Sequence, residues 1–479
     1  MPYILIALGA LLVAFIAVVT IRTLRFTPKA LPPISDEEIH FDKDKIVDDL
    51  ARLVRCKTIS RPGHVGEDDA EFEKLVNMLP ELYPNVYAKC ELKRFPDRAL
   101  LYKWEGKNHD KPSVFMSHYD VVPVNEADWD KPPFDGVMED GILYGRGVLD
   151  TKITFAGALF SANHLIAEGF VPENDIYLAF SGCEEVNGPG AKHIVDYFEE
   201  NKIDPVMVLD EGGAVVEGAF PGLKSPCAVI GIAEKGMIEV EYRTKSNGGH
   251  ASAPKPHTPV GILSRACVRV EKNPFKSHLT KPVKEMFDTL GRHSNALYKT
   301  IFANMWCFGW VIDLLGKMQG GDINALIRTT VAFTQMSGSS ASNVIPPEAT
   351  MVSNIRLNPE DTTESALEYL KGVVNDENVQ LSMLNGYNPS RISRTDCEGY
   401  ERVASAVVST WHGAIPTPYL MVQCSDSRHW GRISDKVYRF SAMDLSKEER
   451  ASIHGNNERI RFECAHKACE FFIRIMSKC

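Results

Sequence analysis

The chain has 479 residues, of which 44% are hydrophobic and 24% are charged, a balance that is typical of globular proteins. This length exceeds one typical hydrophobic core, so two domains are expected. The formal net charge of −10 argues against nucleic acid as a partner, because phosphate binding requires a positively charged face. The 11 cysteines follow no regular spacing, which excludes a disulfide framework and a CxxC zinc ribbon.

The N-terminus contains an apolar stretch, Tyr3 to Ile21, that carries no charge and is long enough to cross a bilayer as a helix. No Lys or Arg precedes it and no small-residue cleavage site follows it, which favours a retained anchor over a cleaved signal peptide. We therefore expect residues 1–26 to form a single-pass membrane anchor and the start of a linker. Arg22, Arg25 and Lys29 follow it, and the positive-inside rule would place the remaining chain in the cytoplasm.

Three short apolar runs alternate with helical segments and read as strands of a parallel sheet. The runs are Ser113–Ser117, Asp175–Gly182 and Pro205–Leu209. Each run leads into metal-type ligands, which are His118 and Asp120, Glu184 and Glu185, and Asp210. Because ligands bind outside the carboxyl ends of parallel strands, these side chains should meet at one edge of the sheet. The pattern predicts a metallohydrolase of the α/β class.

The pattern changes after residue 235. The next elements are expected in the order strand, helix, strand, strand, helix, strand, which is the ferredoxin-like unit. In chain order they are Met237–Arg243, Pro259–Glu271, Arg328–Gln335, Thr350–Leu357, Thr363–Val374 and Val379–Leu384. We therefore expect a small α+β domain over residues 236–387, inserted between two parts of the catalytic domain at 40–235 and 388–479.

An aromatic segment, Asn273–Ile327, interrupts the expected small domain. It contains Phe302, Trp306 and Trp310, among other large apolar side chains. It could serve as helical packing in the small domain or at a dimer interface, or as an apolar wall for a substrate group, and the sequence leaves both open.

The segment around Asp150 is the most specific of the chemical signals. Gly145 and Gly147 allow a tight turn that would place Asp150 at the mouth of a helix, where a carboxylate can bridge two cations. The adjacent Glu184 and Glu185 cannot both face one point, so one would bind metal and the other would transfer protons.

Two further groups complete the predicted site. Asp120 is close enough to hold the second ring nitrogen of His118 or to brace a neighbouring loop. Asp210 would bind the second ion, and His454 lies in a Gly/Asn-rich loop that could return to the site.

These motifs resemble the dinuclear-zinc aminoacylase and carboxypeptidase family, and the resemblance covers the chain from about Asp44 to the C-terminus. The matching segments are Ser117–Pro123, Trp129, Pro132–Phe134, Gly145–Lys152, Glu184–Glu185, Leu209–Gly213, Glu234–Gly236, Gly249–Pro254, Asn343–Pro347, Ser425–Arg428 and His454–Glu458. The segment Asn324–Thr330 and the long insertion before it are most similar to carboxypeptidase S and to the N-fatty-acyl-amino-acid synthase/hydrolase branch. Secreted and lumenal relatives leave the side of the membrane open.

The resemblance implies a zinc-peptidase catalytic domain with a mainly parallel central sheet and an inserted lid and dimerisation domain. It assigns one zinc to His118, Asp150 and Asp210, with Asp150 bridging to a second zinc; cobalt or manganese are alternatives. The ligands of that second ion are Asp150, Glu185 and His454.

The resemblance also implies the remaining roles. Glu184 would be the general base and acid, and Asp120 would orient His118. His250 would reach the active site of the partner in a homodimer and stabilise the oxyanion. Asn343 and Arg356 would bind the terminal carboxylate of the substrate, with Arg428 as a competing candidate.

The leading hypothesis is therefore a carboxypeptidase of the carboxypeptidase S type, acting on small peptides. The alternative is an N-fatty-acyl-amino-acid hydrolase or synthase. Two further hypotheses are a single-metal aminopeptidase and a catalytically silent, membrane-tethered binding protein on the same fold.

Overall fold

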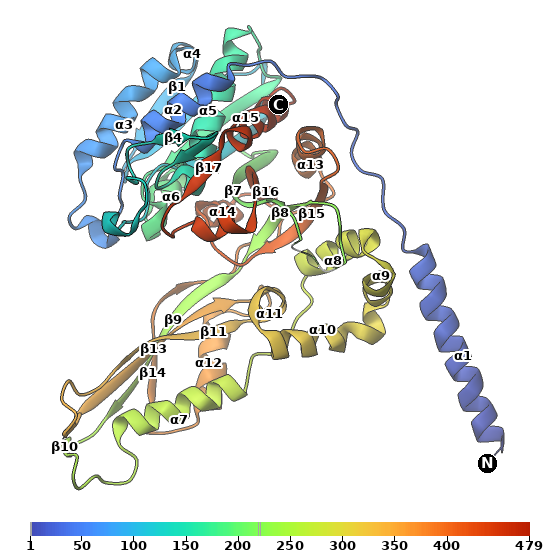
Figure 1. Cartoon of the computed structure of the whole chain (residues 1–479), viewed down its shortest axis with the longest axis vertical. Helices are drawn as coiled ribbons and strands as arrows, with labels where there is room; N and C mark the ends of the chain where they lie inside the picture. The colour runs from blue at the N-terminus through green and yellow to red at the C-terminus, as the bar shows by residue number, and fades with distance from the viewer. Residues whose placement is uncertain (1, 219, 221) are drawn as a thin grey trace.

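The computed structural model describes residues 2–218, 220 and 222–479. A large sheet with helices on both faces lies above a small sheet, and a set of helices lies beside the junction of the two (Figure 1). The N-terminal helix stands apart from both sheets at the end of an extended linker.

The large sheet has eight strands and is mixed. In spatial order they are β1 (Glu91–Phe95), β2 (Ala99–Trp104), β6 (Asn174–Ser181), β3 (Asn108–His118), β7 (Met207–Val216), β16 (Val437–Leu445), β8 (Cys227–Glu234) and β15 (Ile415–Met421). The central strands β6, β3, β7 and β16 run parallel to one another. The three predicted runs lie in β3, β6 and β7, which confirms the α/β class and brings their carboxyl ends to one edge.

Helices cover both faces of the large sheet, so its central strands are apolar in both directions. In β6, Leu178 belongs to the core under α5, whereas Tyr177 and Ala179 belong to the core under α6. This alternation follows from the two-residue period of a strand. The helices that cover the two faces are α2 (Lys43–Val54), α3 (Asp69–Leu82), α4 (Pro84–Lys89), α5 (Ile153–Ala167), α6 (Gly190–Glu200), α13 (Glu398–Thr410) and α15 (Phe462–Met476).

The small sheet is antiparallel, in the order β11-β13-β9-β14. Its strands are β9 (Gly236–Lys245), β11 (Thr330–Ser337), β13 (Glu348–Leu357) and β14 (Gln380–Tyr387). Helices α7 (Pro259–Lys272) and α12 (Thr363–Val374) pack on it around one apolar core. The elements follow one another in the predicted order, and β9 begins one residue after β8 ends.

The aromatic insertion forms four helices between α7 and β11. They are α8 (Lys281–His293), α9 (Ala296–Ala303), α10 (Met305–Gln319) and α11 (Gly321–Ile327). Met286, Phe287 and Leu290 of α8 belong to the core of the large sheet, and the core of the small sheet contains none of the described residues of these helices. The insertion therefore packs on the catalytic sheet, although it falls within the range expected for the small domain.

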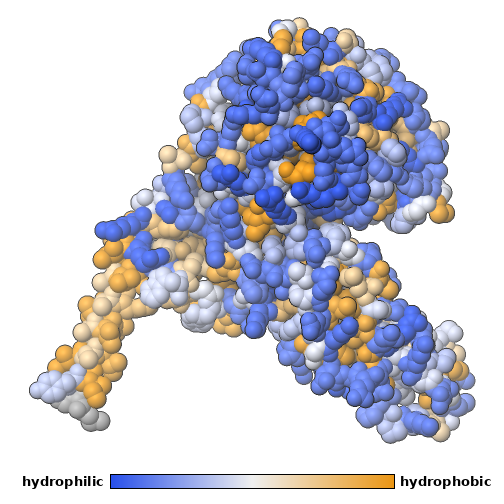
Figure 2. Space-filling view, turned by 180° about the vertical axis from the view of Figure 1, so that it is seen from behind, coloured by the Kyte–Doolittle hydropathy of each residue, from blue (hydrophilic) through white to orange (hydrophobic). Residues whose placement is uncertain are grey.

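Helix α1 (Pro2–Arg25) contains a span, Tyr3–Arg25, that is long and apolar enough to cross a membrane. None of its most apolar window is buried against the protein. Figure 2 shows this helix as an apolar column that protrudes from an otherwise largely polar surface.

Candidate metal centre

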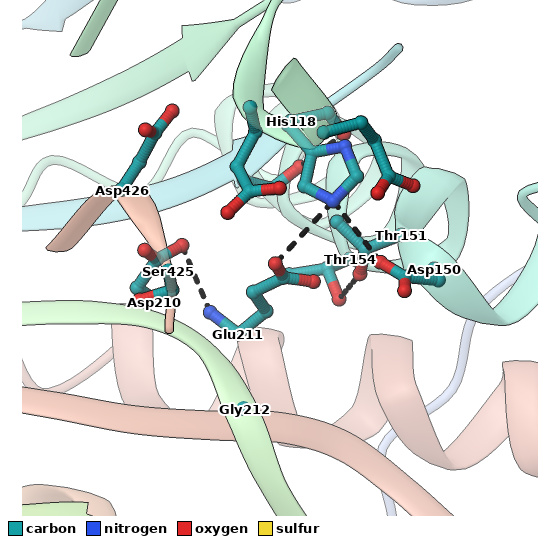
Figure 3. Close-up of polar contacts among 12 residues, drawn as sticks. His118, Asp150, Thr151, Thr154, Asp210, Glu211, Gly212, Ser425 and Asp426 are labelled. Atoms are coloured by element: carbon teal, nitrogen blue, oxygen red, sulfur yellow. Dashed lines mark hydrogen bonds and ion pairs between the residues drawn. The ribbon is translucent and has the colours of Figure 1, made fainter. Parts of the chain in front are cut away.

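His118 stands at the carboxyl end of β3 and is buried. Its Nδ1 donates a hydrogen bond to the backbone oxygen of Asp120 (3.0 Å), which leaves Nε2 as the free ring nitrogen. This Nε2 faces Asp150 Oδ1 at 3.1 Å and Glu211 Oε1 at 3.3 Å (Figure 3). An imidazole nitrogen flanked by two carboxylates is a suitable ligand set for a divalent cation.

Asp150 lies between two histidines. Its Oδ1 faces His118, and its Oδ2 lies 3.0 Å from Nε2 of His454. The same His454 nitrogen lies 3.0 Å from Glu185 Oε2. Asp150 thus offers one oxygen to each half of the cluster, which is the arrangement that a bridging carboxylate between two cations requires.

Asp120 organises the neighbouring loop as well as His118. Its carboxylate accepts hydrogen bonds from the backbone nitrogens of Glu184 (3.1 Å) and Glu185 (3.2 Å). The hydroxyl of Ser60 donates to the same carboxylate (2.6 Å). With its carboxylate held in this way, Asp120 fixes the turn from which Glu184 and Glu185 project. The Glu184 carboxylate approaches His118 and Glu211, whereas Glu185 lies beside His454. The two adjacent glutamates therefore lie in different halves of the cluster.

The structure corrects the expectation for Asp210. Both of its oxygens accept backbone hydrogen bonds, from Glu211 (2.9 Å) and from Ser427 (2.9 Å), and Asp210 lies away from His118 (Figure 3). Neighbouring residues of a strand point to opposite faces, so only one of the two acids in β7 can enter the cluster. Glu211 is that residue. The motif Leu209–Gly213 contains both acids, and its local pattern does not distinguish them.

The loop that carries His454 is tied to the loop that carries Asp150. The His454 loop lies between α14 (Lys447–Ser452) and strand β17 (Arg459–Arg461). Strand β17 pairs with β5 (Ile142–Tyr144), just before the Asp150 turn, and β5 also pairs with β4 (Val137–Glu139). The buried Glu458 accepts hydrogen bonds from Arg146 Nη1 (2.6 Å) and from the backbone nitrogen of Gly147 (2.9 Å). Gly147 has a φ of 80°, a left-handed conformation that glycine adopts without strain. The sequence motif contained Glu458, but its role was not predicted.

The acidic residues of the cluster are crowded in a buried place. Burial and the neighbouring Asp150 raise the pKa of Glu185 to about 7. Burial raises the pKa of Glu184 well above its ordinary value, and it also raises that of Glu211. Glu185 Oε1 is buried and accepts no hydrogen bond from the described residues. An unsatisfied oxygen among crowded carboxylates fits a site that binds cations, because a divalent ion would neutralise their charge.

The histidines respond to the same charges. Hydrogen bonds that the ring of His454 donates to the carboxylates of Asp150 and Glu185 raise the pKa of His454 to about 10. Burial alone would lower the pKa of His118, but nearby carboxylates, Glu211 first among them, raise it well above its ordinary value. The donor set of nitrogens and carboxylate oxygens suits zinc and similar divalent ions.

Two arginines lie at the junction of the two sheets. Arg428 donates to the backbone oxygen of Ser425 (2.8 Å), and its guanidinium lies over the ring of Tyr387 at 5.3 Å. Arg356 contacts the sulfur of Cys424 (3.8 Å), which is its one hydrogen-bond partner among the described residues. Arg428 thus contacts a carbonyl oxygen and lies 3.8 Å from Asp426, whereas the one side-chain hydrogen bond of Arg356 among the described residues is to a sulfur.

His250 and Asn343 lie elsewhere. Strand β10 (Gly249–His250) pairs with β12 (Val344–Ile345) at the far tip of the small sheet (Figure 1). The backbone nitrogen of Ala251 donates to the backbone oxygen of Asn343 (3.0 Å), so the two predicted residues share this tip. Within one chain they do not meet the metal cluster, and Asn343 does not meet Arg356.

A cavity of about 670 Å³ adjoins the cluster. Asp150, Glu185 and His454 line one part of it, and the remaining lining is mainly apolar. The apolar lining includes Phe220, Met286, Phe287, Leu290, Ile301, Phe302, Val311, Ile312, Leu315, Ile323, Leu326, Met421 and Met443. Helices α8 to α11 thus form an apolar wall that begins at the metal cluster.

Residues 114–478, which contain every member of this cluster, match the sequence model of one peptidase family. The chain belongs to peptidase family M20/M25/M40. This protein is therefore an M20 metallohydrolase, and the predicted family resemblance is confirmed. It is 31% identical to the probable carboxypeptidase S-like 2 of Dictyostelium discoideum, over 97% of this chain and 92% of that protein. It is also 31% identical to an N-fatty-acyl-amino acid synthase/hydrolase of Xenopus tropicalis, over 97% and 93% of the two chains.

Solved structures of M20 proteins share the fold. An M20 metallo-carboxypeptidase from Sulfolobus solfataricus superposes with a TM-score of 0.66 at 17% identity, over 90% of this chain and 98% of that one. A dinuclear metal-binding M20 peptidase of Bacillus subtilis superposes with a TM-score of 0.53 at 11% identity, over 91% and 98% of the chains. At these identities the likeness shows the fold alone, and the chemistry of this chain depends on its own residues.

Proposed function

We propose that this M20 enzyme holds two zinc ions and cleaves an amide bond whose leaving group is an amino acid with a free carboxylate, as a carboxypeptidase of the carboxypeptidase S type. The observation that carries the proposal is the position of Asp150, with one oxygen toward His118 and the other toward His454. His118, Asp150 and Glu211 would hold one ion. Asp150, Glu185 and His454 would hold the other.

When bound, two such cations polarise the scissile carbonyl and acidify the attacking water. Glu184 then takes the proton of that water and delivers it to the leaving nitrogen. Asp120 holds His118 through its backbone oxygen and holds the backbone of Glu184 through its carboxylate. The ligand and the base therefore keep a fixed position relative to each other.

Arg356 is our candidate for binding the substrate carboxylate. A guanidinium binds a carboxylate in two parallel hydrogen bonds, and Arg356 has no carboxylate partner among the described residues, whereas Arg428 lies 3.8 Å from Asp426. Arg428 would instead hold Ser425 and shape the floor of the carboxylate site. The predicted pair of Asn343 and Arg356 lies at different ends of the small sheet within one chain, so the two would meet one substrate only across a dimer.

The exposed tip of the small sheet supports a homodimeric enzyme. His250 and Asn343 would complete the active site of the partner subunit, where His250 donates to the oxyanion that forms as the carbonyl is attacked. This proposal accounts for a polar pair at the tip of the small sheet, which lies away from the metal cluster among the described residues of its own chain.

An N-fatty-acyl-amino acid is the second candidate substrate, and the apolar cavity favours it. The acyl carbonyl would lie at the cluster while the chain extends along the wall of α8 to α11. The same site could then release or join a fatty acid and an amino acid. Helix α1, as a single-pass anchor, would keep the enzyme at a membrane where such amphiphiles gather.

One assay tests both candidates. The zinc-loaded full chain is given a blocked dipeptide and a hexadecanoyl amino acid, each with a free carboxylate and as the carboxamide. We expect the carboxamides to react at least about 100-fold more slowly, because the partly buried Arg356 would lack its charged partner. Faster turnover of the fatty amide would make the second candidate the main activity. Equal turnover of free acids and carboxamides would contradict the proposal, and cleavage of an unblocked amino-acid amide instead would indicate an aminopeptidase.

A further inference from the structure

Helix α10 exposes a stripe of large apolar side chains. Trp306, Trp310, Leu314 and Met318 are 58%, 66%, 45% and 74% exposed. They recur every four residues, so they lie on one face of the helix. The two charged residues of α10, Asp313 and Lys317, pair with each other at 2.8 Å and add no net charge. A soluble surface rarely presents such a stripe without something to cover it.

The stripe begins beside helix α1 at Trp306, and the residues at the start of α10 contact that helix. The side-chain nitrogen of Asn304 donates to the backbone oxygen of Val19 (3.3 Å) and to the hydroxyl of Thr23 (3.1 Å). The rings of Phe15 and Trp306 meet edge to face with centroids 5.8 Å apart. The apolar surface of α1 therefore continues onto α10 through Trp306.

The end of α1 is tethered as well. Arg292 of α8 donates to the backbone oxygen of Thr27 (2.8 Å) and lies over the ring of Phe26. Lys29 pairs with Asp288 of α8 at 2.7 Å. These contacts keep the C-terminal end of α1 next to the insertion, so a bilayer that surrounds α1 comes close to α10.

The opposite face of α10 lines the catalytic cavity. Val311, Ile312 and Leu315 belong to that lining, and Ile312 is buried. One helix therefore separates the exposed stripe from an apolar space that reaches the metal cluster. Figure 1 shows α9 and α10 between α1 and the sheets.

We propose that α10 is an interfacial helix, which lies on the bilayer that α1 spans and embeds Trp306, Trp310, Leu314 and Met318 in it. This inference rests on the anchoring part of the proposed function. Tryptophan is the residue that membrane–water interfaces favour, and an apolar helix face of low charge buries there readily. The partner of this surface is lipid, because the stripe is continuous with the lipid-facing surface of α1. The wall of the catalytic cavity would then lie against the hydrocarbon region.

The tryptophans provide a direct readout. The chain has six, and Trp104, Trp129, Trp411 and Trp430 are all buried. The full chain is reconstituted in phosphatidylcholine vesicles whose acyl chains are either plain or dibrominated, since bromine quenches indole fluorescence on contact. We expect the brominated lipid to lower the emission, and we expect the double variant Trp306→Phe, Trp310→Phe to lose most of that quenching.

A second comparison tests docking rather than the fluorophores. Replacing Trp310, Leu314 and Met318 by serine removes most of the apolar stripe. This triple variant should show weaker quenching of the remaining Trp306 and an emission shifted to the red. The control places serine at Met383 and Leu384 of β14, which are also exposed, and should leave the quenching unchanged.

Carbonate extraction separates the anchor from the docking surface. If the chain resists extraction but its tryptophans are not quenched, α10 does not contact lipid and the inference fails while the anchor stands. If the stripe is shielded only as the protein concentration rises, its occupant is a second copy, which also overturns the inference. If carbonate extracts the chain, the anchor proposal fails, and quenching alone then decides whether α10 binds lipid.

Discussion

The buried carboxylate of Glu458 accepts a hydrogen bond from the backbone nitrogen of Asp150 (3.2 Å) across 308 positions of sequence. Its other bonds, to Arg146, Gly147 and Leu149, close the same turn. Glu458 also belongs to the loop that carries His454. One buried acid therefore sets the position of two ligands that come from opposite ends of the catalytic domain.

Replacing Glu458 by glutamine should destabilise the protein by about 3 kcal/mol, because it leaves the buried Arg146 without its counter-ion. Urea unfolding of the full chain in detergent measures this loss, and zinc titration should show weaker binding. The matched control is Glu463→Gln, whose side chain is 71% exposed on α15. An E458Q variant as stable as the control would mean that the turn does not depend on this carboxylate.

The two acids of β7 should differ in their effect on metal. Glu211→Ala should weaken binding of one ion by more than roughly 100-fold, since it removes a group 3.3 Å from His118. Asp210→Asn should cost no more than roughly 10-fold to 100-fold, because Asp210 contacts backbone nitrogens instead. Metal content after dialysis against a weak chelator measures both. The opposite ranking would restore Asp210 as the ligand.

Glu184→Gln should keep both metal ions and lose turnover by roughly 100-fold to 10,000-fold, because the proton carrier is removed and the ligands stay. The measurement pairs kcat with metal content on the same preparation. A variant that lost metal in proportion to activity would show that Glu184 is a ligand and not the base.

Metal affinity should rise with pH. The pKa of His454 is raised to about 10 and that of Glu185 to about 7, so both groups tend to hold protons that a cation must displace. Between pH 7 and 10 the proton of His454 is displaced, the raised pKa of His118 acts in the same direction, and affinity should increase at least about tenfold per pH unit. Below pH 7 the cation must also displace the proton of Glu185, so metal affinity should depend more steeply on pH. Calorimetry in buffers of different ionisation enthalpy counts the protons released; affinity that is flat with pH would contradict this.

The inner and outer faces of α10 allow a matched test of the cavity. Leu315→Trp fills space in the lining and should slow hydrolysis of a long-chain N-acyl amino acid by about 10-fold or more. Hydrolysis of an acetyl amino acid should change little. Leu314→Trp, one residue away on the exposed face, should leave both rates unchanged in detergent. Equal effects of the two variants would show that the cavity does not hold the acyl chain.

Much of this architecture follows from local patterns. The strands that lead to His118 and Glu184, the turn at Asp150 and the order of elements in the small sheet are visible as apolar runs, glycines and periodicity. Such features depend on neighbours within a few residues, and short-range physics decides them. The sequence by itself therefore determined the α/β class, the type of chemistry and most of the residues that meet at the cluster.

Tertiary structure decided what depends on the packing of distant segments. Asp210 and Glu211 are adjacent and both carry a carboxylate. Only the orientation of β7 in the sheet decides that Glu211 points toward His118. The insertion could have packed on either sheet, and burial of α8 against β8 and β15 joined it to the catalytic core. Its outer stripe and inner cavity wall arise because α10 packs on that core with one face and leaves the other exposed. In both cases contacts between distant segments decide the outcome, because residues near in sequence do not distinguish the alternatives.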